Sequence, residues 1–334
     1  MVTEVVYSEK FLEHDQSMHP ENAERLRAIM DEIHDSSIVD RLRIKEPSSI
    51  SEEELFLIHS KEMVEYIRRL SETSGWVDFD TYVCPGSFEI AKLAAGGVVG
   101  LAHDVLRGEV ENGFALVRPP GHHATSSRSM GFCLFNNVAL AANSVAGEGK
   151  RVLVFDHDVH HGNGTQEIFY KRDDVLYQSF HLSPHYPGTG GVDEIGEGDG
   201  RGFTINAPLP KGAGDKTILF LLDEVFLPIA EQFKPDLVIV SAGFDSHYLD
   251  QLGGLRLSAN CFAEIIKKFK GVQPRILCSL EGGYNLKLLG RLVLTELEVL
   301  VGKKPSYSER VEETNNAKKV ADEVKNKVKE YWSF

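Results

Sequence analysis

The segment RVLVFD at residues 151–156, followed by HDVHHGNG at 157–164, decides the fold. Residues Val152 to Phe155 form a continuous apolar run that ends in charged side chains. Strands buried on both faces of a parallel sheet have this pattern, although a short apolar run alone also fits a buried helix. We therefore expect an α/β domain with this segment as a central strand.

Four further segments have the same strand pattern, and helical patterns lie between them. The predicted strands are 114–117 (FALV), 175–180, 237–241 and 276–280, and the predicted helices are 23–33, 60–70, 87–106, 136–146, 217–233 and 259–268. This alternation indicates βαβ units and a largely parallel sheet. Apolar residues recur every four positions from Val320 to Trp332, which predicts a C-terminal amphipathic helix at about 311–334. No repeat or linker divides the chain, so we expect one domain over 1–334.

Composition excludes several classes of function. The 36 basic and 50 acidic side chains give a net charge of −14, and nucleic-acid binding usually shows a basic footprint instead. No apolar run reaches the roughly 18 residues of a membrane helix. The N-terminal residues MVTEVVYSEK lack the basic region and apolar core of a signal peptide, so we expect a cytoplasmic protein. The four cysteines are far apart, which suggests buried thiols and neither disulfides nor a zinc knuckle.

Polar residues follow each predicted strand. The five segments are RPPGHHA, HDVHHGNG, HLSPHYPGTG, AGFDSHYLD and EGGYN, in the order of the chain. The carboxyl ends of parallel strands meet at one edge of a sheet, where open α/β proteins build their sites. These segments contain eight of the 13 histidines: His122, His123, His157, His160, His161, His181, His185 and His247. We expect the five segments to form one site.

The segment after the central strand suits a divalent metal. Alternate side chains of an extended stretch share a face, so Asp156, Asp158 and His160 point together. Asp245, from a neighbouring strand end, is a further oxygen ligand. Two aspartates and one histidine leave coordination positions open, as a catalytic site requires. The alternative, polar caps hydrogen-bonded at strand ends, would suit an isolated Asp-x-His better than five converging segments.

Three other groups have residues suited to catalysis. His122 and His123 are adjacent imidazoles that can divide the roles of general base and general acid, although a lone histidine pair is more often structural. Tyr284 follows two glycines, which alone is a weak signal, and its hydroxyl is a group that can donate to a developing oxyanion. Phe132 and Tyr186 suit the walls of a narrow apolar passage, with core packing as the other explanation of Phe132.

Taken in order, RPPGHHA, GFCLFNN, DHDVHHGNGTQ, AGFD and LEGGYN resemble the zinc-dependent histone deacetylase family. That family includes acetylpolyamine amidohydrolases and acetoin-utilisation proteins, and the resemblance extends from HPENAERL at 19–26 to EGGYNLKLLG at 281–290. HHGNGTQ and CPGSFEIAKLAAG are more similar to its class II branch. The resemblance implies a single three-layer α/β domain, with a mostly parallel eight-stranded sheet flanked by helices, related to arginase.

The resemblance also implies roles for particular residues. It makes Asp158, His160 and Asp245 the zinc ligands, His122 and His123 the tandem acid–base histidines, and Tyr284 the carbonyl-polarising tyrosine. It places Asp156 behind His122 and Asn163 behind His123. Because class I members have an aspartate where this chain has Asn163, His123 should be less basic than in class I.

The remaining implied sites are peripheral. A potassium ion would lie among Asp156, Asp158, His160, Ser179 and Phe180. Phe132 and Tyr186 would line the walls of the substrate tunnel, and Gly131 would lie at its inner chamber. Asp80 would bind substrate at the rim, and Arg25 would lie in an acetate channel.

The implied reaction is direct hydrolysis of an N-acetyl amide to acetate and free amine. Zinc is the implied metal, and iron(II) also suits a site of two aspartates and one histidine. An acetyl-lysine peptide or protein and an acetylated small amine such as a polyamine both fit a narrow tunnel. Ser71–Val83 looks too short for the inserted loop of polyamine-specific members, which slightly favours a peptide or protein substrate.

Two other functions have to be weighed against this one. An arginase-like hydrolase with two manganese ions would need a second aspartate after Asp245, where Asp245-Ser246-His247 has none. A non-catalytic module that only binds acetylated ligands would not need the histidine pair or Tyr284, and both are present.

Overall fold

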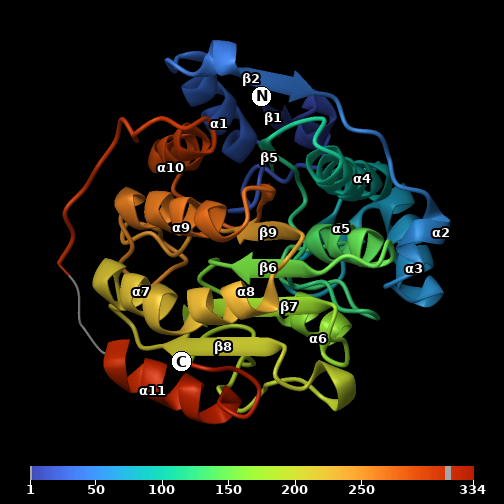
Figure 1. Ribbon diagram of the computed structural model, residues 1–334. Helices are drawn as coiled ribbons and strands as arrows, with labels where there is room; N and C mark the ends of the chain where they lie inside the picture. Colours follow the sequence, from blue (N-terminus) through green and yellow to red (C-terminus); the bar gives the residue numbers. More distant parts are fainter. Residues whose placement is uncertain (1, 313–316) are drawn as a thin grey trace.

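The computed structural model describes residues 2–312 and 317–334. It is a single α/β domain, as predicted, with eight strands in one sheet in the order β2-β1-β5-β10-β9-β6-β7-β8 (Figure 1). Every pair of neighbouring strands described in this sheet is parallel. The strands are β1 (Thr3–Val6), β2 (Leu42–Lys45), β5 (Asn112–Ala115), β6 (Val152–Asp156), β7 (Val175–Leu182), β8 (Thr204–Leu209), β9 (Leu237–Ala242) and β10 (Ile276–Leu280). A short antiparallel hairpin joins β3 (Gly75–Trp76) and β4 (Tyr82–Val83).

Helices cover both faces of the sheet, which makes three layers (Figure 1). One layer contains α3 (Lys61–Thr73), α4 (Ser87–Leu106), α5 (Asn137–Ala146) and α6 (Asn163–Phe169). The other contains α1 (Glu24–His34), α7 (Asp215–Leu221), α8 (Leu227–Phe233), α9 (Ala259–Val272) and α10 (Leu286–Leu300). The short α2 (Glu52–Leu55) precedes α3, and α11 (Ala317–Val328) packs beside edge strand β8. None of the described helices combines the length and the apolar character needed to span a membrane.

The predicted elements are present, with three differences. β5 begins two residues before the predicted FALV strand, because buried Asn112 is satisfied by the Thr3 hydroxyl and the Leu300 carbonyl. A π-helical turn at Leu222–Phe226 divides the helix predicted at 217–233 into α7 and α8. The C-terminal helix ends at Val328, earlier than predicted, and the chain then turns so that the Trp332 indole donates to the Gly202 carbonyl at 2.7 Å. Residues 313–316 of that prediction lie outside the described residues.

The register of the central strands brings the predicted site together. One row of paired residues crosses five strands: Ala115, Ser279, Ser241, Asp156 and Ser179. Since all five strands are parallel, the segment that follows each strand leaves the sheet at this same edge. The sheet therefore places the five polar segments next to one another, although up to about 160 residues of chain separate them.

Helix α4 approaches the backbone of the segment at residues 48–50. A Cβ built on Gly96 would lie 2.0 Å from the Ser48 carbonyl oxygen and 2.6 Å from the Ile50 nitrogen. One turn further along the same helix, a Cβ on Gly100 would have no neighbour within 4 Å. An alanine has a higher helix propensity than glycine at both positions, but its Cβ would clash with the backbone only at residue 96.

We expect these two glycines to respond oppositely to alanine. Gly96→Ala should lower the free energy of unfolding by about 1–3 kcal/mol, the usual cost of overpacking. Gly100→Ala should raise it by about 0.5–1 kcal/mol through helix propensity. Urea denaturation of both variants measures the two changes, and stabilisation by both substitutions would contradict the close approach of α4 to 48–50.

Candidate functional site

Two aspartates and a histidine converge at the carboxyl edge of the sheet. Asp158 and His160 follow β6, and Asp245 follows the neighbouring β9. One ligand atom from each of the three lies within 4.8 Å of the others. His160 Nδ1 is 3.0 Å from Asp158 Oδ1 and 3.2 Å from Asp245 Oδ2. The structure thus assembles the three predicted metal ligands into one group.

The surroundings of this group fit a divalent cation. Both aspartates are fully buried, and Asp245 Oδ2 has no hydrogen-bond partner among the described residues. The remaining carboxylate oxygens of the two aspartates accept hydrogen bonds from backbone N–H groups. Asp158 Oδ2, for example, accepts from the Gly282 N–H at 2.8 Å. A Cβ on Gly282 would lie 2.1 Å from Asp245 Oδ2, and one on Gly243 would lie 2.0 Å from Asp158 Oδ2. Glycine at both positions leaves the carboxylates room for a ligand.

Electrostatics in this group also favour a cation. Burial raises the pKa of Asp245 to about 6, and the adjacent charge of Asp158 adds to that effect. Burial lowers the pKa of His160, but the neighbouring Asp158 and Asp245 carboxylates outweigh it and raise the pKa to about 10. Buried carboxylates are stable only when positive charge compensates them. A divalent cation with hard oxygen and imidazole ligands would supply that charge.

The two predicted acid–base histidines lie beside the group. Their ring centroids are 4.0 Å apart, and each Nδ1 has its own partner. His122 Nδ1 is 3.0 Å from Asp156 Oδ2, and His123 Nδ1 is 2.8 Å from Asn163 Oδ1. Burial lowers the pKa of His122, but Asp156 and Asp158 outweigh it and raise the pKa to about 10.

His123 has the opposite electrostatic environment. Burial, followed by the positive charges of His122 and His160, lowers its pKa well below the ordinary value. The asparagine behind His123 has a smaller effect on the pKa than burial does. The pair therefore consists of one basic and one weakly basic imidazole, as a division of proton-transfer roles requires.

One cavity of about 260 Å³ contains these groups. Both histidines, His160, Tyr284 and Gly282 line it, together with Asp80, Gly131, Phe132 and Tyr186 among the other predicted residues. Gly131 and Phe132 both have positive φ, at 57° and 69°, and a Cβ on Gly131 would lie 2.5 Å from the His123 ring. Glycine at 131 thus serves both the turn and the close approach to His123.

The loop that carries Tyr284 is held from two sides. Asp250 Oδ2 accepts from the Tyr284 N–H at 2.7 Å, and Gln251 donates to the Tyr284 carbonyl at 2.7 Å. Arg25, fully buried, donates to the carbonyls of Gly283 and Glu281 at 2.7 and 2.5 Å and lies over the Tyr284 ring. In this structure the predicted acetate-channel arginine contacts the back of the tyrosine loop.

The predicted potassium residues are neighbours. Asp156 pairs with Ser179 in the β6–β7 register, and Phe180 is the next residue of β7. All three are fully buried.

Sequence reasoning missed several residues of the site. Asp250 and Leu252 lay in or beside the polar segments, but nothing in their spacing distinguished them, whereas His185 was among the histidines expected at the site. His185 stacks on His160 at 4.9 Å between centroids, and Leu252 lines the cavity. Glu281 was part of the EGGYN segment, and its carboxylate accepts from the N–H groups of Gly121 and His122 at 2.7 and 3.1 Å.

The model of the histone deacetylase domain matches residues 19–300 of the chain. The chain therefore belongs to the histone deacetylase domain family, and it is a hydrolase of amide bonds. The predicted resemblance is confirmed.

Similar proteins agree with this assignment. The chain is 41% identical to a probable deacetylase of Archaeoglobus fulgidus, over 90% of this chain and 86% of that one. It is 37% identical to a histone deacetylase-like amidohydrolase of Pseudomonas aeruginosa, over 83% and 76% of the two chains. The crystal structure of the HDA15 HD domain superposes with a TM-score of 0.93 at 37% identity, covering 99% of this chain and 95% of that one. Against two longer histone deacetylases of Arabidopsis thaliana, the chain spans 52% and 48% of their length.

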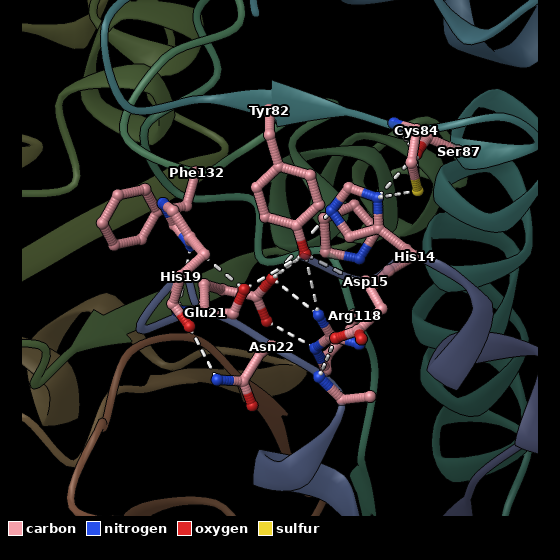
Figure 2. Close-up of polar contacts among 12 residues, drawn as sticks. His14, Asp15, His19, Glu21, Asn22, Tyr82, Cys84, Ser87, Arg118 and Phe132 are labelled. Carbon is pink, nitrogen blue, oxygen red and sulfur yellow. Dashed lines mark hydrogen bonds and ion pairs between the residues drawn. The ribbon is translucent and has the colours of Figure 1, made fainter. Parts of the chain in front are cut away.

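Glu21 is the centre of a buried ion-pair network (Figure 2). The Glu21 carboxylate, from the HPENAERL segment, accepts from Arg118 at 2.5 and 2.9 Å, from Arg25 at 3.2 Å and from the Tyr82 hydroxyl at 3.2 Å. All three charged side chains are fully buried. Glu21 therefore joins the arginine beneath the Tyr284 loop to the arginine that begins the RPPGHHA segment.

Removing the charge of Glu21 should destabilise the fold and change its response to acid. Burial raises the pKa of Glu21, but Arg118 and Arg25 outweigh it and lower the pKa from 4.5 to about 2. A carboxylate with a depressed pKa stabilises the fold above its unfolded pKa, so this contribution of about 3 kcal/mol is lost as the pH falls from about 4.5 towards 2. We expect Glu21→Gln to lower the free energy of unfolding at pH 7 by about 3–5 kcal/mol, because two buried arginines lose their partner.

Denaturation at a series of pH values between 7 and 3 tests this expectation, with Glu24→Gln as the control. Glu24 is 59% exposed and pairs with Arg27 at the surface, so its loss should change stability little. Equal acid dependence of Glu21→Gln and the unsubstituted protein would contradict the depressed pKa of Glu21.

Proposed function

We propose that this chain is a zinc-dependent deacetylase that hydrolyses the N-acetyl amide of a long, thin amine to acetate and the free amine. One observation carries the proposal. Asp158, His160 and Asp245 form one cluster, and His160 of this cluster lines the same cavity as the His122–His123 pair and Tyr284.

Asp158, His160 and Asp245 would hold the metal. A zinc ion in this position supplies Lewis-acid activation of water and of an amide carbonyl. Iron(II) accepts the same ligands. The orphaned oxygen of Asp245 and the glycines at 243 and 282 support this role.

The hydrogen bonds at each Nδ1 support a division of the proton-transfer roles. The Asn163 oxygen accepts from His123 Nδ1, so in the neutral ring Nε2 is unprotonated and can take a proton from water. Asp156 stabilises the protonated form of His122, which keeps positive charge beside the reacting centre. Neither role needs a covalent intermediate.

Tyr284 stabilises the oxyanion. Burial raises the pKa of its hydroxyl well above the ordinary value, so the group remains a hydrogen-bond donor. As the water oxygen adds to the carbonyl carbon, the carbonyl oxygen gains negative charge beside this donor. The C–N bond then breaks, a histidine returns the proton to nitrogen, and acetate and amine leave. We assign acetate release to the side of Arg25 and a structural potassium ion to the pocket of Asp156, Ser179 and Phe180.

The cavity walls select the shape of the substrate. Phe132 and Tyr186 face a passage of about 260 Å³, which suits an unbranched alkyl chain better than a bulky group. Acetyl-lysine in a protein or peptide and an acetylpolyamine both have such a chain. The β3–β4 hairpin that carries Asp80 to the cavity is short, which slightly favours the peptide or protein. The relatives named as deacetylases are consistent with either substrate.

Metal content distinguishes the proposal from an arginase-like manganese site. His247 Nε2 and Ser246 Oγ bond to Glu309 and to the His157 carbonyl, so neither is free to bind a second metal. We expect one zinc per chain after reconstitution, and a large loss of zinc in Asp245→Asn. Elemental analysis measures the ratio, with the exposed Asp193→Asn as the control. Two manganese ions per chain would favour the arginase-like alternative.

Turnover distinguishes an enzyme from an acetyl-binding module. We expect hydrolysis of an acetyl-lysine peptide, and a fall in kcat of about a hundredfold to a thousandfold in Tyr284→Phe, because one oxyanion donor is lost. KM should change less, since the phenylalanine ring still lines the cavity. Parallel assays with acetylputrescine and acetylspermidine rank the substrates. Binding of all three without turnover by the zinc-loaded protein would favour the module.

A further inference from the structure

A segment beyond the family-matched region is fastened to the site. We call residues 303–312 the tail; it follows α10 and lies past residue 300, where the match to the family model ends. The Glu309 side chain is 7% exposed and accepts four hydrogen bonds. Its donors are His247 Nε2 at 2.9 Å, the Ala259 N–H at 2.9 Å, the Tyr307 hydroxyl at 2.8 Å and the Tyr248 hydroxyl at 3.2 Å.

The backbone of the tail makes further contacts with the same region. Asn260 Nδ2 donates to the Glu309 carbonyl at 2.6 Å, and Arg256 Nε donates to the Glu312 carbonyl at 2.5 Å. The Glu309 carboxylate also lies at the N-terminus of α9, where an acidic group is favourable. The tail is therefore attached through several bonds, with Glu309 at their centre.

His247 connects Glu309 to the site. Its ring is fully buried, and its Nδ1 accepts from the Leu249 N–H at 3.3 Å. This bond leaves the proton on Nε2, which then donates to Glu309. Without the carboxylate, the Nε2–H would be a buried donor with no partner, and this unfavourable state favours movement of the loop.

The loop at residues 245–252 contributes to both halves of the proposed chemistry. It begins with Asp245 of the metal cluster and contains Asp250, which accepts from the backbone N–H groups of Tyr284 and Asn285 at 2.7 and 3.0 Å. It ends with Leu252 at the cavity wall. A shift of this loop would displace Asp245 and the support of Tyr284 together.

We propose that Glu309 is a positioning residue that fixes loop 245–252 through His247 and so keeps Asp245 and Tyr284 in their working geometry. The inference rests on the proposed function in one respect, that Asp245 is a metal ligand. A carboxylate with four donors in a nearly buried position holds its partners more firmly than neutral hydrogen bonds would. Glu309 touches neither the metal cluster nor the cavity, so its effect passes through the loop.

The test is the rate at which zinc leaves the protein into a chelator in excess, measured for the full chain loaded with zinc. Glu309→Gln has the same shape but loses the charge, and we expect its zinc dissociation to be about tenfold faster, the lower end of the effect of losing a group that orients a metal ligand. Glu309→Asp, which retains the carboxylate, should recover part of the difference. Glu312→Gln is the matched control, because Glu312 is exposed and contributes only its backbone carbonyl to the contacts described above; its rate should be unchanged.

A second control separates positioning from general stability. Trp332→Phe removes the indole bond to Gly202, on the β8 side of the molecule, and should lower Tm without changing zinc dissociation. If Glu309→Gln does not fold, Tyr248→Phe and Tyr307→Phe each remove one donor to Glu309, and both together should accelerate zinc dissociation. A lower Tm for Glu309→Gln with an unchanged dissociation rate would overturn the proposal and leave Glu309 as an anchor of the tail. A wild-type chain that binds no zinc would instead overturn the proposed function.

Discussion

Two carboxylates buried side by side at the end of the sheet constrain everything around them. Asp158 and Asp245 are fully buried, and buried carboxylates are stable only when N–H donors and positive charge compensate them. The Gly282 N–H reaches Asp158 because no side chain intervenes, and His160 lies between the two carboxylates. The same absence of a Cβ leaves space for a cation. The site is thus built from glycine turns and imidazoles because the carboxylates require them.

Buried charges further out hold the loops of the site in place. Glu21 joins two arginines from segments that are almost 100 residues apart, and one of them, Arg25, supports the carbonyls behind Tyr284. Asp250 supports the same loop from the other side, and Glu309 fastens the segment that carries Asp250. In each contact, fixed donors replace the water around a buried charge, and the charge in turn holds a loop of the site.

Local sequence was sufficient for the central strands and for the composition of the site. The apolar runs of β6, β7, β9 and β10 are buried on both faces, and runs of that kind have few other stable environments. The strands β1, β2 and β8 were not predicted. β5 was displaced by two residues because Asn112 is polar yet buried, and its partners Thr3 and Leu300 are distant in the sequence. The family resemblance, and not the spacing of residues, supplied the roles of Asn163, Ser179 and Arg25.

By itself, the sequence determined which residue types follow each strand, and the rule that parallel strands share an exit edge placed them together. Tertiary structure alone decided which of them face one another. A sequence pattern predicts the burial of a residue from the residues next to it in the chain. The hydrogen-bond partners of Glu21, Asp250 and Glu309 come mainly from other segments. A buried carboxylate is tolerated only where distant donors meet it. Such meetings depend on the packing of whole elements, and no local pattern contains that information.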